Sequence, residues 1–438
     1  PPPPFNDPPP PYTNTRSDTL SYTTLFRSGM AMGTASLLTI LQGGTLNALI
    51  ITQKLLSGVS KFSLLAIPMF TLAGEVMTLG GVSDKLIYLA NRVVGRFKGG
   101  LSMVTTLACM FFGAISGSAT ATAAAIGGIM VEPMEKAGYK KEYTAAVIAS
   151  SGLLGLIIPP SGTMLMYAIV ADVSVLEMFT GGIIPGIIMG LSLMVVEYFR
   201  AKKNGYGTSE LDIAEFHTQS KAKIVIQSFL ALLSPVIILG GIYSGKFTAT
   251  EAAGVSVLYG FIIGYFVFKQ LNIKKAYEAC VKTGVSTSMI LFLIGAAAVF
   301  GWMLTMQQIP NQIVAAISGI TNSPAVVLLL VNLALFVAGA LLDNVAAITL
   351  LTPVLVPLIS AYGIDKTFFG IIMIINLSIG QITPPIGMNL FVSSSICEVR
   401  LEKVIRQVLP FLAVLIVDLF LFTYIPGIVT VLPNALLH

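Results

Sequence analysis

Charged residues are scarce along this chain. Its 438 residues include only 25 Lys and Arg and 20 Asp and Glu, so 10% are charged while 55% are hydrophobic. A soluble domain carries about 25% charged residues, so this composition excludes a soluble enzyme, a nucleic-acid binder and a disordered protein. A membrane-spanning helix takes roughly 20 apolar residues, which leaves room for about ten to fourteen spans. We therefore predict an all-α polytopic membrane protein.

The basic residues indicate orientation in the membrane rather than an acidic partner. The net charge is +5, and Lys and Arg lie in short loops between apolar segments. Two basic segments, near residues 200–223 and 269–282, are separated by two predicted spans and so lie on one side, which we assign to the cytoplasm. Three scattered cysteines and two histidines offer neither a disulfide framework nor a transition-metal motif.

The start of the chain differs from the rest. Residues 1–11 hold eight prolines, and residues 12–28 read YTNTRSDTLSYTTLFRS, which resembles translated sequencing-adapter text. This stretch has neither the basic start nor the apolar run of a signal peptide, and the proline-rich part can only be extended or disordered. We interpret residues 1–28 as a non-native, disordered segment, and we expect the first span to be cut short at its start.

A long uncharged run predicts a helical hairpin. Residues 99–131 contain no charge, and at ~1.5 Å per residue a straight helix of that length would measure about 50 Å, against a hydrocarbon core of ~30 Å. Two full spans with a loop would need more than ~40 residues. A re-entrant hairpin that turns at Ser116, Gly117 and Ser118 fits best. The apolar segment after Glu142 is in turn interrupted at residues 158–162, where two prolines stand together.

The second half of the chain repeats the first at one constant offset. Glycines and prolines coincide, and these residues constrain the backbone; the matched pairs are Gly138 with Gly363, Gly155 with Gly380, Pro159 and Pro160 with Pro384 and Pro385, Gly162 with Gly387, and Pro185 with Pro410. Chance alignment of two apolar stretches is the alternative, and we favour an internal duplication. Two interrupted segments at matching places point to a transporter binding site, and an odd number of crossings between them would invert the copies.

The interrupted segments offer oxygen ligands for a cation. Each proline frees the carbonyl four residues earlier, and a free carbonyl cannot face lipid, so it lines a cavity or binds an ion such as sodium. A proline kink satisfied by nearby Ser or Thr hydroxyls is the open alternative. The hairpins add side-chain oxygens, including the carboxylate of Asp343. A carboxylate is energetically costly within a membrane, which points to a function, and a structural hairpin cap is the alternative. The candidate ion-binding residues are Ser116, Ser118, Gly155, Leu156, Asp343, Asn344, Gly380 and Gln381.

An anionic substrate would need donors other than Lys and Arg, because neither hairpin and neither broken segment contains a basic residue. The positive ends of half-helices, hydroxyls and amides can fill this role. Ser and Thr also bridge helices in ordinary packing, so each residue alone is a weak signal. The candidate substrate-binding residues are Ser161, Asn376, Thr383, Pro384, Gly387 and Asn389.

Several long motifs carry a family resemblance. The chain contains LLAIPMFTLAGEVM, GAISGSATATAAAIG, LGLIIPPS, LDNVAAITLLTPVLVP and GIDKTFFGIIMIINLSIGQITPP. Over about residues 29–438 it resembles the large membrane (permease) subunit of TRAP transporters, the tripartite ATP-independent periplasmic transporters, DctM-like, within the ion transporter superfamily. The resemblance implies an inverted-repeat, elevator-type transporter with two re-entrant hairpins and two broken helices, and no enzymatic activity.

The resemblance also implies partners and a coupling ion. We expect a small DctQ-like membrane subunit, a periplasmic DctP-like substrate-binding protein, and uptake of an organic acid such as a C4-dicarboxylate or sialic acid across the bacterial inner membrane. The implied coupling ion is Na⁺, with no other cofactor, and family sodium sites lie near the hairpins and broken helices. By match, these sites are Ser116, Ser118 and the Gly155–Ser161 break in the first half, and Asp343, Asn344 and the Gly380–Gly387 break in the second.

Six segments follow from these predictions, and three other functions stay open. The segments are residues 1–28, the disordered start; 29–98, a truncated first span with interfacial helices and scaffold; 99–200, the first repeat; 201–222, a polar cytoplasmic loop; 223–320, scaffold spans and connectors; and 321–438, the second repeat. The alternative functions are a stand-alone ion-coupled carboxylate carrier, an intramembrane aspartyl protease that uses Asp343 with Asp418, and a non-transporting scaffold subunit.

Overall fold

The computed structural model describes residues 15–43, 49–206 and 221–437, and within these ranges the chain is helical with no strand. Eight described helices are long and apolar enough to cross a membrane, or nine if one bent pair counts as a span. This confirms the all-α polytopic prediction, although the count falls below ten. Apolar residues that we assigned to further spans lie in shorter helices, because the hairpins and breaks divide them.

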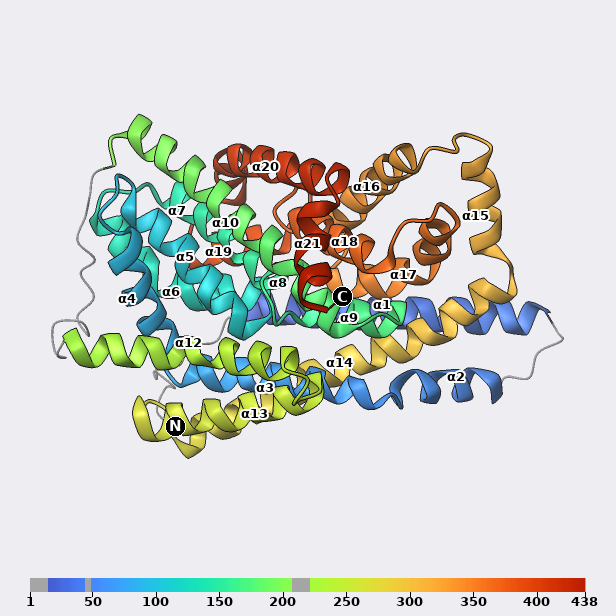
Figure 1. Ribbon diagram of the computed structural model, residues 1–438, viewed down its shortest axis with the longest axis horizontal. Coiled ribbons are helices and arrows are strands. Elements are labelled where there is room, and N and C mark those ends of the chain that lie inside the picture. The colour runs from blue at the N-terminus through green and yellow to red at the C-terminus, as the bar shows by residue number, and fades with distance from the viewer. Residues whose placement is uncertain (1–14, 44–48, 207–220, 438) are drawn as a thin grey trace, which may run out of the picture.

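One group of helices forms a layer along the lower side of the molecule (Figure 1). The long helix α14 packs against three others of the group, α1, α2 and α3. These helices are α1 (Thr15–Gly43), α2 (Leu49–Val59), α3 (Ala66–Leu79) with the preceding 3-10 turn η1 (Phe62–Leu65), α12 (Lys221–Tyr243), α13 (Ala249–Ile262) with the π-helical turn η2 (Ile263–Val267), and α14 (Ile273–Met306). We call this group the scaffold.

The start of α1 corrects a prediction. Residues 15–28, which we expected to be disordered, form the first half of a 29-residue helix. Leu25 and Met32 are buried against Leu293 of α14, and the ring of Phe26 stacks on Phe292 at 5.6 Å. Burial of these apolar side chains offsets the entropy of ordering the segment. The helix α1 thus includes the segment that we expected to be disordered, although it is not among the eight candidate spans. Residues 1–14 lie outside the described ranges.

The remaining helices form two matching sets. In the first, α4 (Val82–Val94) leads into α5 (Gly100–Ser116), α6 (Ala119–Lys136), α7 (Lys141–Gly152), α8 (Leu154–Ile157), α9 (Gly162–Ala171) and α10 (Val175–Asn204). In the second, α15 (Ile309–Ser318) leads into α16 (Pro324–Leu341), α17 (Asn344–Ala361), α18 (Lys366–Gly380), α19 (Met388–Ile396), α20 (Leu401–Tyr424) and α21 (Gly427–Leu437). The hairpin turns obey the offset of the paired glycines and prolines, since α5 ends at Ser116 and α16 at Leu341.

The two sets interlock. Figure 1 shows the α5–α6 hairpin toward one end of the molecule and the α16–α17 hairpin toward the other. The half-helix α9 packs against α17 and α18, and its counterpart α19 packs against α6 and α7. Two hydrogen bonds join the sets: the Tyr167 hydroxyl donates to the Lys366 carbonyl at 2.8 Å, and the buried Asn389 amide donates to the Ala149 carbonyl at 2.8 Å. The half-helix of each set therefore packs within the other set.

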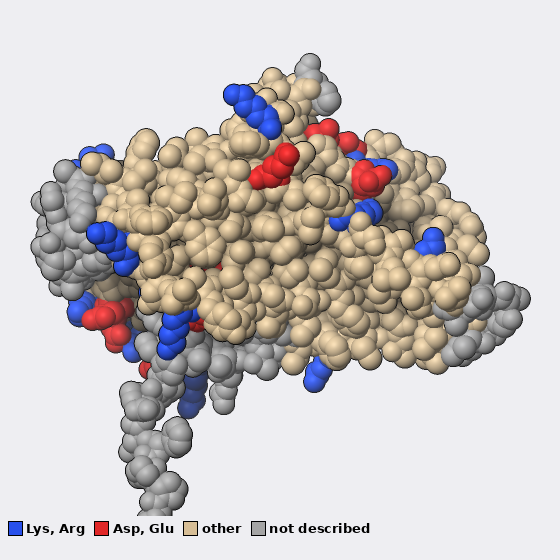
Figure 2. Space-filling model, turned by 90° about the horizontal axis from the view of Figure 1, so that it is seen from below, with Lys and Arg blue, Asp and Glu red and all other residues tan. Residues whose placement is uncertain are grey.

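Large apolar side chains cover the outer surface of the scaffold. Phe229 on α12 is 71% exposed, and Leu258 on α13 is 62% exposed. Figure 2 shows a face whose middle carries few charged side chains, with most Lys, Arg, Asp and Glu toward its margins. A monomeric soluble protein rarely exposes so extensive an apolar surface. The surface thus matches a bilayer and agrees with the multi-pass prediction.

Candidate ion and substrate site

The two hairpin turns both end in a side-chain N-cap. In the first, Gly117 ends α5 with a φ of 61°, a left-handed conformation that favours glycine, and Ser118 caps α6 by accepting a hydrogen bond from the Ala121 N–H at 3.4 Å. In the second, Asp343 caps α17 by accepting one from the Val345 N–H at 2.9 Å. Both turns therefore place a polar side chain at the start of a returning helix.

The first turn lies directly on the break between α8 and α9. A Cβ on Gly117 would stand 3.0 Å from the Gly162 nitrogen and 3.3 Å from the Pro160 carbonyl oxygen. Gly155 is equally confined, because its Cβ would stand 2.6 Å from the Ser118 carbonyl oxygen. Glycine lets the turn and the broken helix approach to backbone contact. The structure thus brings together the predicted residues of the first half.

Hydroxyl groups line this first contact. The hydroxyls of Ser116 and Thr122 are 2.7 Å apart, and those of Ser118 and Thr120 are 3.3 Å apart. Thr122 was not predicted, although its place one turn after Ser118 on the same helix is the signal that could have found it. The scaffold also reaches this point, since a Cβ on Gly74 of α3 would stand 3.3 Å from the Ser116 Cα.

The carbonyls freed by Pro159 and Pro160 have different surroundings. The Leu156 carbonyl accepts hydrogen bonds from the Ser161 hydroxyl at 2.5 Å and the Thr163 hydroxyl at 3.1 Å. At Leu156 the structure thus has the hydroxyl-satisfied kink that we kept as the alternative. No described donor reaches the carbonyl of Gly155, so that oxygen is left without a hydrogen bond.

Ser161→Ala is expected to destabilise the first break. The substitution removes the N-cap of α9 and the shorter of the two hydrogen bonds to the buried Leu156 carbonyl, and such a loss costs about 1–3 kcal/mol of unfolding free energy. Thermal melting in detergent measures the effect. The matched control is Ser288→Ala, which removes an exposed hydroxyl bonded to the Gly284 carbonyl at 2.7 Å. Equal melting shifts for the two variants would contradict this assignment.

The second half offers open side-chain oxygens instead of free carbonyls. The Gly380 carbonyl accepts from the Thr383 N–H at 2.9 Å, and the Gln381 carbonyl accepts from the Asn389 N–H at 3.1 Å. Asn344 is 1% exposed and donates to the Ser378 hydroxyl at 3.4 Å. The Asn344 Oδ1 and Gln381 Oε1 atoms are buried and have no hydrogen-bond partner among the described residues. Such orphaned acceptors are costly unless something binds them.

The candidate substrate residues do not form one cluster of free donors. The amides of Asn376 and Asn389 donate inside the protein, to Asn332 on α16 and to Ala149 on α7. Thr383 donates to the Ile379 carbonyl at 2.9 Å, and Ser161 to the first break. Pro384 is half-buried, and Gly387 caps α19 with a φ of 52°. The groups that remain at the breaks to bind an anion are therefore the N-terminal ends of α9 and α19.

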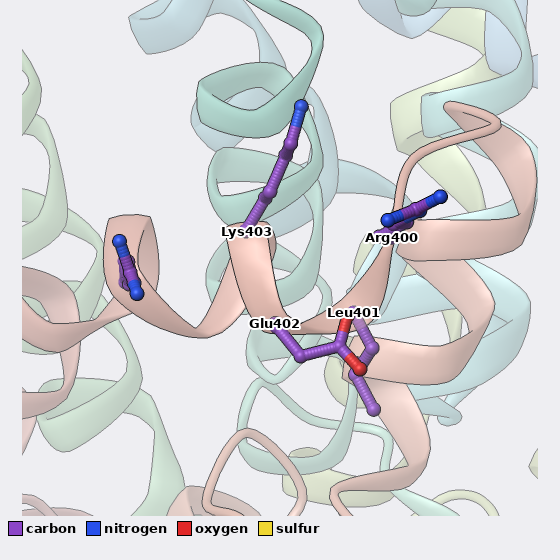
Figure 3. Close-up of a pocket in the computed structure, with 5 residues that line it drawn as sticks. Arg400, Leu401, Glu402 and Lys403 are labelled. Carbon is purple, nitrogen blue, oxygen red and sulfur yellow. The ribbon is translucent and has the colours of Figure 1, made fainter.

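A basic hollow elsewhere contains none of the predicted residues. It lies at the start of α20 and is lined by Arg400, Leu401, Glu402, Lys403 and Arg406. Figure 3 shows Lys403 extending toward the neighbouring helix, away from Arg400 and Glu402. Its ammonium pairs with Glu142 of α7 at 3.3 Å. This hollow is a charged surface at the helix ends, distinct from the hairpin turns.

The fold and the paired breaks define a membrane transporter with two hairpin-bearing repeats. The family described as the tripartite ATP-independent periplasmic transporter, DctM component, matches residues 23–428. The chain belongs to this family of transport subunits, which are not enzymes.

Similar proteins share most of the chain. It is 39% identical to the C4-dicarboxylate TRAP transporter large permease protein DctM of Pseudomonas aeruginosa, over 92% of this chain and 94% of that one. It is 37% identical to the sialic acid large permease SiaM of Vibrio cholerae, over 88% and 89%. It is also 38% identical to the isethionate permease DctMQ of Oleidesulfovibrio alaskensis, over 91% of this chain, which spans only 62% of that relative's length.

A solved structure shares the fold. The YdaH transporter of Alcanivorax borkumensis aligns with a TM-score of 0.65 over 92% of this chain and 97% of its own, at 14% sequence identity. At that identity the likeness concerns the fold alone.

Proposed function

We propose that this chain is the large permease subunit of a sodium-coupled transporter that takes up an organic acid across the bacterial inner membrane. The acid would be a C4-dicarboxylate, sialic acid or a similar anion, because the named relatives carry such compounds. A periplasmic binding protein would deliver it, in keeping with the family's tripartite and periplasmic description. A small membrane subunit would complete the complex, and the longer DctMQ relative leaves room for one.

The observation that carries the proposal is the set of oxygens at the second hairpin turn and at the break that follows α18. Asp343 supplies a carboxylate, and the Asn344 Oδ1 and Gln381 Oε1 atoms are buried without partners among the described residues. Hard cations take carboxylate, amide and carbonyl oxygens, and one carboxylate balances one monovalent ion. The first turn would hold a second ion among Ser116, Ser118 and the Gly155 carbonyl.

The substrate's negative charge would rest on helix N-termini. Four helices begin at the turns and breaks: α6, α17, α9 and α19. Their free N–H groups and partial positive charge attract an anion without any Lys or Arg. Sodium at the turns would add positive charge beside these helix starts, so the acid and the ion would favour each other's binding.

The contacts between the repeats and the scaffold favour an elevator-like movement. Apolar side chains dominate this interface, with Ile67, Met166 and Ile294 in one cluster and Met32 and Ala346 in another. A cavity of about 290 Å³ is also lined by residues of α1, α14 and α17. Two hydrogen bonds join the repeats to each other. The repeats can therefore slide as a unit, because few directional bonds hold them to the scaffold.

Uptake into proteoliposomes tests this function. The chain is reconstituted with a small DctQ-like subunit and a DctP-like binding protein, and labelled C4-dicarboxylate, sialic acid or isethionate is supplied outside. We expect uptake that requires an inward sodium gradient and both partners. Uptake without partners would favour the stand-alone carrier, and uptake driven by a proton gradient in sodium-free buffer would contradict sodium coupling.

A further inference from the structure

A buried acid outside the candidate site joins three helices of the first repeat. Glu197 of α10 is 0% exposed and accepts a hydrogen bond from the Thr106 hydroxyl of α5 at 2.5 Å. The Thr106 hydroxyl also lies 2.6 Å from the Ser151 hydroxyl of α7. We call Glu197, Thr106 and Ser151 the first bridge. It holds the hairpin arm, the broken helix and the following span together.

The second repeat has a matching bridge without an acid. The Asn376 amide of α18 donates to Asn332 Oδ1 of α16 at 2.8 Å, and the Asn332 amide donates to the Thr423 hydroxyl of α20 at 3.0 Å. We call Asn376, Asn332 and Thr423 the second bridge. Ser151 and Asn376 match at the same offset as the paired glycines and prolines, and the other two pairs depart from it by a single position. Within each repeat, hydrogen bonds thus join side chains at corresponding positions. In the second repeat all three of these side chains are neutral.

No cation compensates Glu197 within the part of the chain that the structure describes. Its Oε2 atom is buried without a partner, and no described Lys, Arg or His lies within ion-pairing distance. Arg200, one turn further along α10, instead donates to Gln407 and lies over the Tyr143 ring at 5.4 Å. The other titratable groups that face the acid are Cys109, Tyr139 and Tyr143, none of them a cation. An unpaired buried carboxylate is among the most costly groups that a protein can bury.

We propose that Glu197 holds a resident proton, so that the first bridge is neutral like the second. With the proton on Oε1, the carboxyl O–H donates to the Thr106 hydroxyl instead of accepting from it, and Thr106 in turn donates to the Ser151 hydroxyl. Glu197, Thr106 and Ser151 then form a chain of neutral hydrogen bonds between α10, α5 and α7. Ser151 lies one helical turn before Gly155. The proton therefore keeps a negative charge away from the first break while the bridge fixes the helix that forms it.

Infrared spectroscopy of the purified protein at neutral pH tests for the proton. The carbonyl stretch of a protonated carboxyl is separate from the bands of a carboxylate. We expect Glu197→Gln to remove a protonated-carboxyl band and to leave the carboxylate bands unchanged. Asp418→Asn is the matched control, because Asp418 is also buried and accepts from the Ser192 hydroxyl at 3.1 Å, and it should leave the Glu197 band in place. Loss of a carboxylate band in Glu197→Gln would overturn the proposal.

Melting and uptake supply two further readouts. Because a neutral amide replaces a neutral acid, Glu197→Gln should melt close to wild type, whereas Glu197→Ala should melt much lower. A Glu197→Gln protein that fails to fold or melts as low as Glu197→Ala would show that the ionised form is required. Sodium-driven uptake should persist in Glu197→Gln. Its loss from a well-folded variant would show that the proton moves during transport, which contradicts a resident one.

Discussion

Gly380→Ala is expected to disrupt the second hairpin more than any other single added methyl group at the site. A Cβ on Gly380 would stand 2.6 Å from both the Cα and the carbonyl oxygen of Gly339 on α16. Backbone cannot move aside as a flexible side chain does, so α18 and α16 would have to separate. Overpacking of this kind costs roughly 1–3 kcal/mol or more, and we expect the upper end of that range. Thermal melting and elution as a single species report the damage.

The matched control for this substitution is Gly128→Ala. Gly128 lies on α6 with no atom within 4 Å of the added methyl group, and Ala is about 1 kcal/mol more favourable than Gly in a helix interior. The control should therefore melt at or above the wild-type temperature. If Gly380→Ala melted as well as Gly128→Ala, the close contact between the hairpin and the broken helix would be wrong.

Asp343→Asn is expected to abolish sodium binding at the second turn while the fold survives. Asn caps helices as well as Asp does, so the amide can still accept from the Val345 N–H. The lost charge matters far more, because a unit charge about 4 Å from a cation contributes roughly 4 kcal/mol at an effective dielectric constant near 20. We expect sodium affinity to fall by more than about a hundredfold and sodium-driven uptake to disappear.

Asp365→Asn provides the same change at a surface cap. Asp365 is exposed and caps α18 by accepting from the Phe368 N–H at 2.6 Å, so this variant also loses a charge at a helix start. It should keep sodium binding and uptake. An Asp343→Asn protein with wild-type uptake would show that Asp343 is a structural cap and not an ion ligand.

The repeat was predictable because glycine and proline mark backbone geometry. The constant offset between pairs such as Gly155 and Gly380 matches the ends of the hairpin helices to the residue. The disorder expected for residues 15–28 was wrong, since α14 supplies an apolar partner such as Leu293 that no local pattern displays.

The details of the site depend on contacts between segments far apart in the chain. The rule that a proline frees a carbonyl located the breaks. In the structure, however, the carbonyls of Leu156, Gly380 and Gln381 accept hydrogen bonds. Asn389 looked like a ligand from its own motif, and its amide instead donates to the Ala149 carbonyl of the other repeat. Glu197 lies near basic residues in the sequence, and only the packing of α5 and α7 around it reveals its burial.

Thermal melting in sodium, compared with potassium or choline, tests the central claim most directly. A ligand that binds only the folded state raises stability by RT ln(1 + [L]/Kd), roughly 2.7 kcal/mol at a hundredfold excess over Kd, and no knowledge of the substrate is needed. We predict a sodium-specific rise for wild type and Asp365→Asn, a smaller rise for Ser118→Ala, and the smallest for Asp343→Asn. Equal melting of well-folded wild-type protein in all three salts would contradict a sodium site at the hairpin turns.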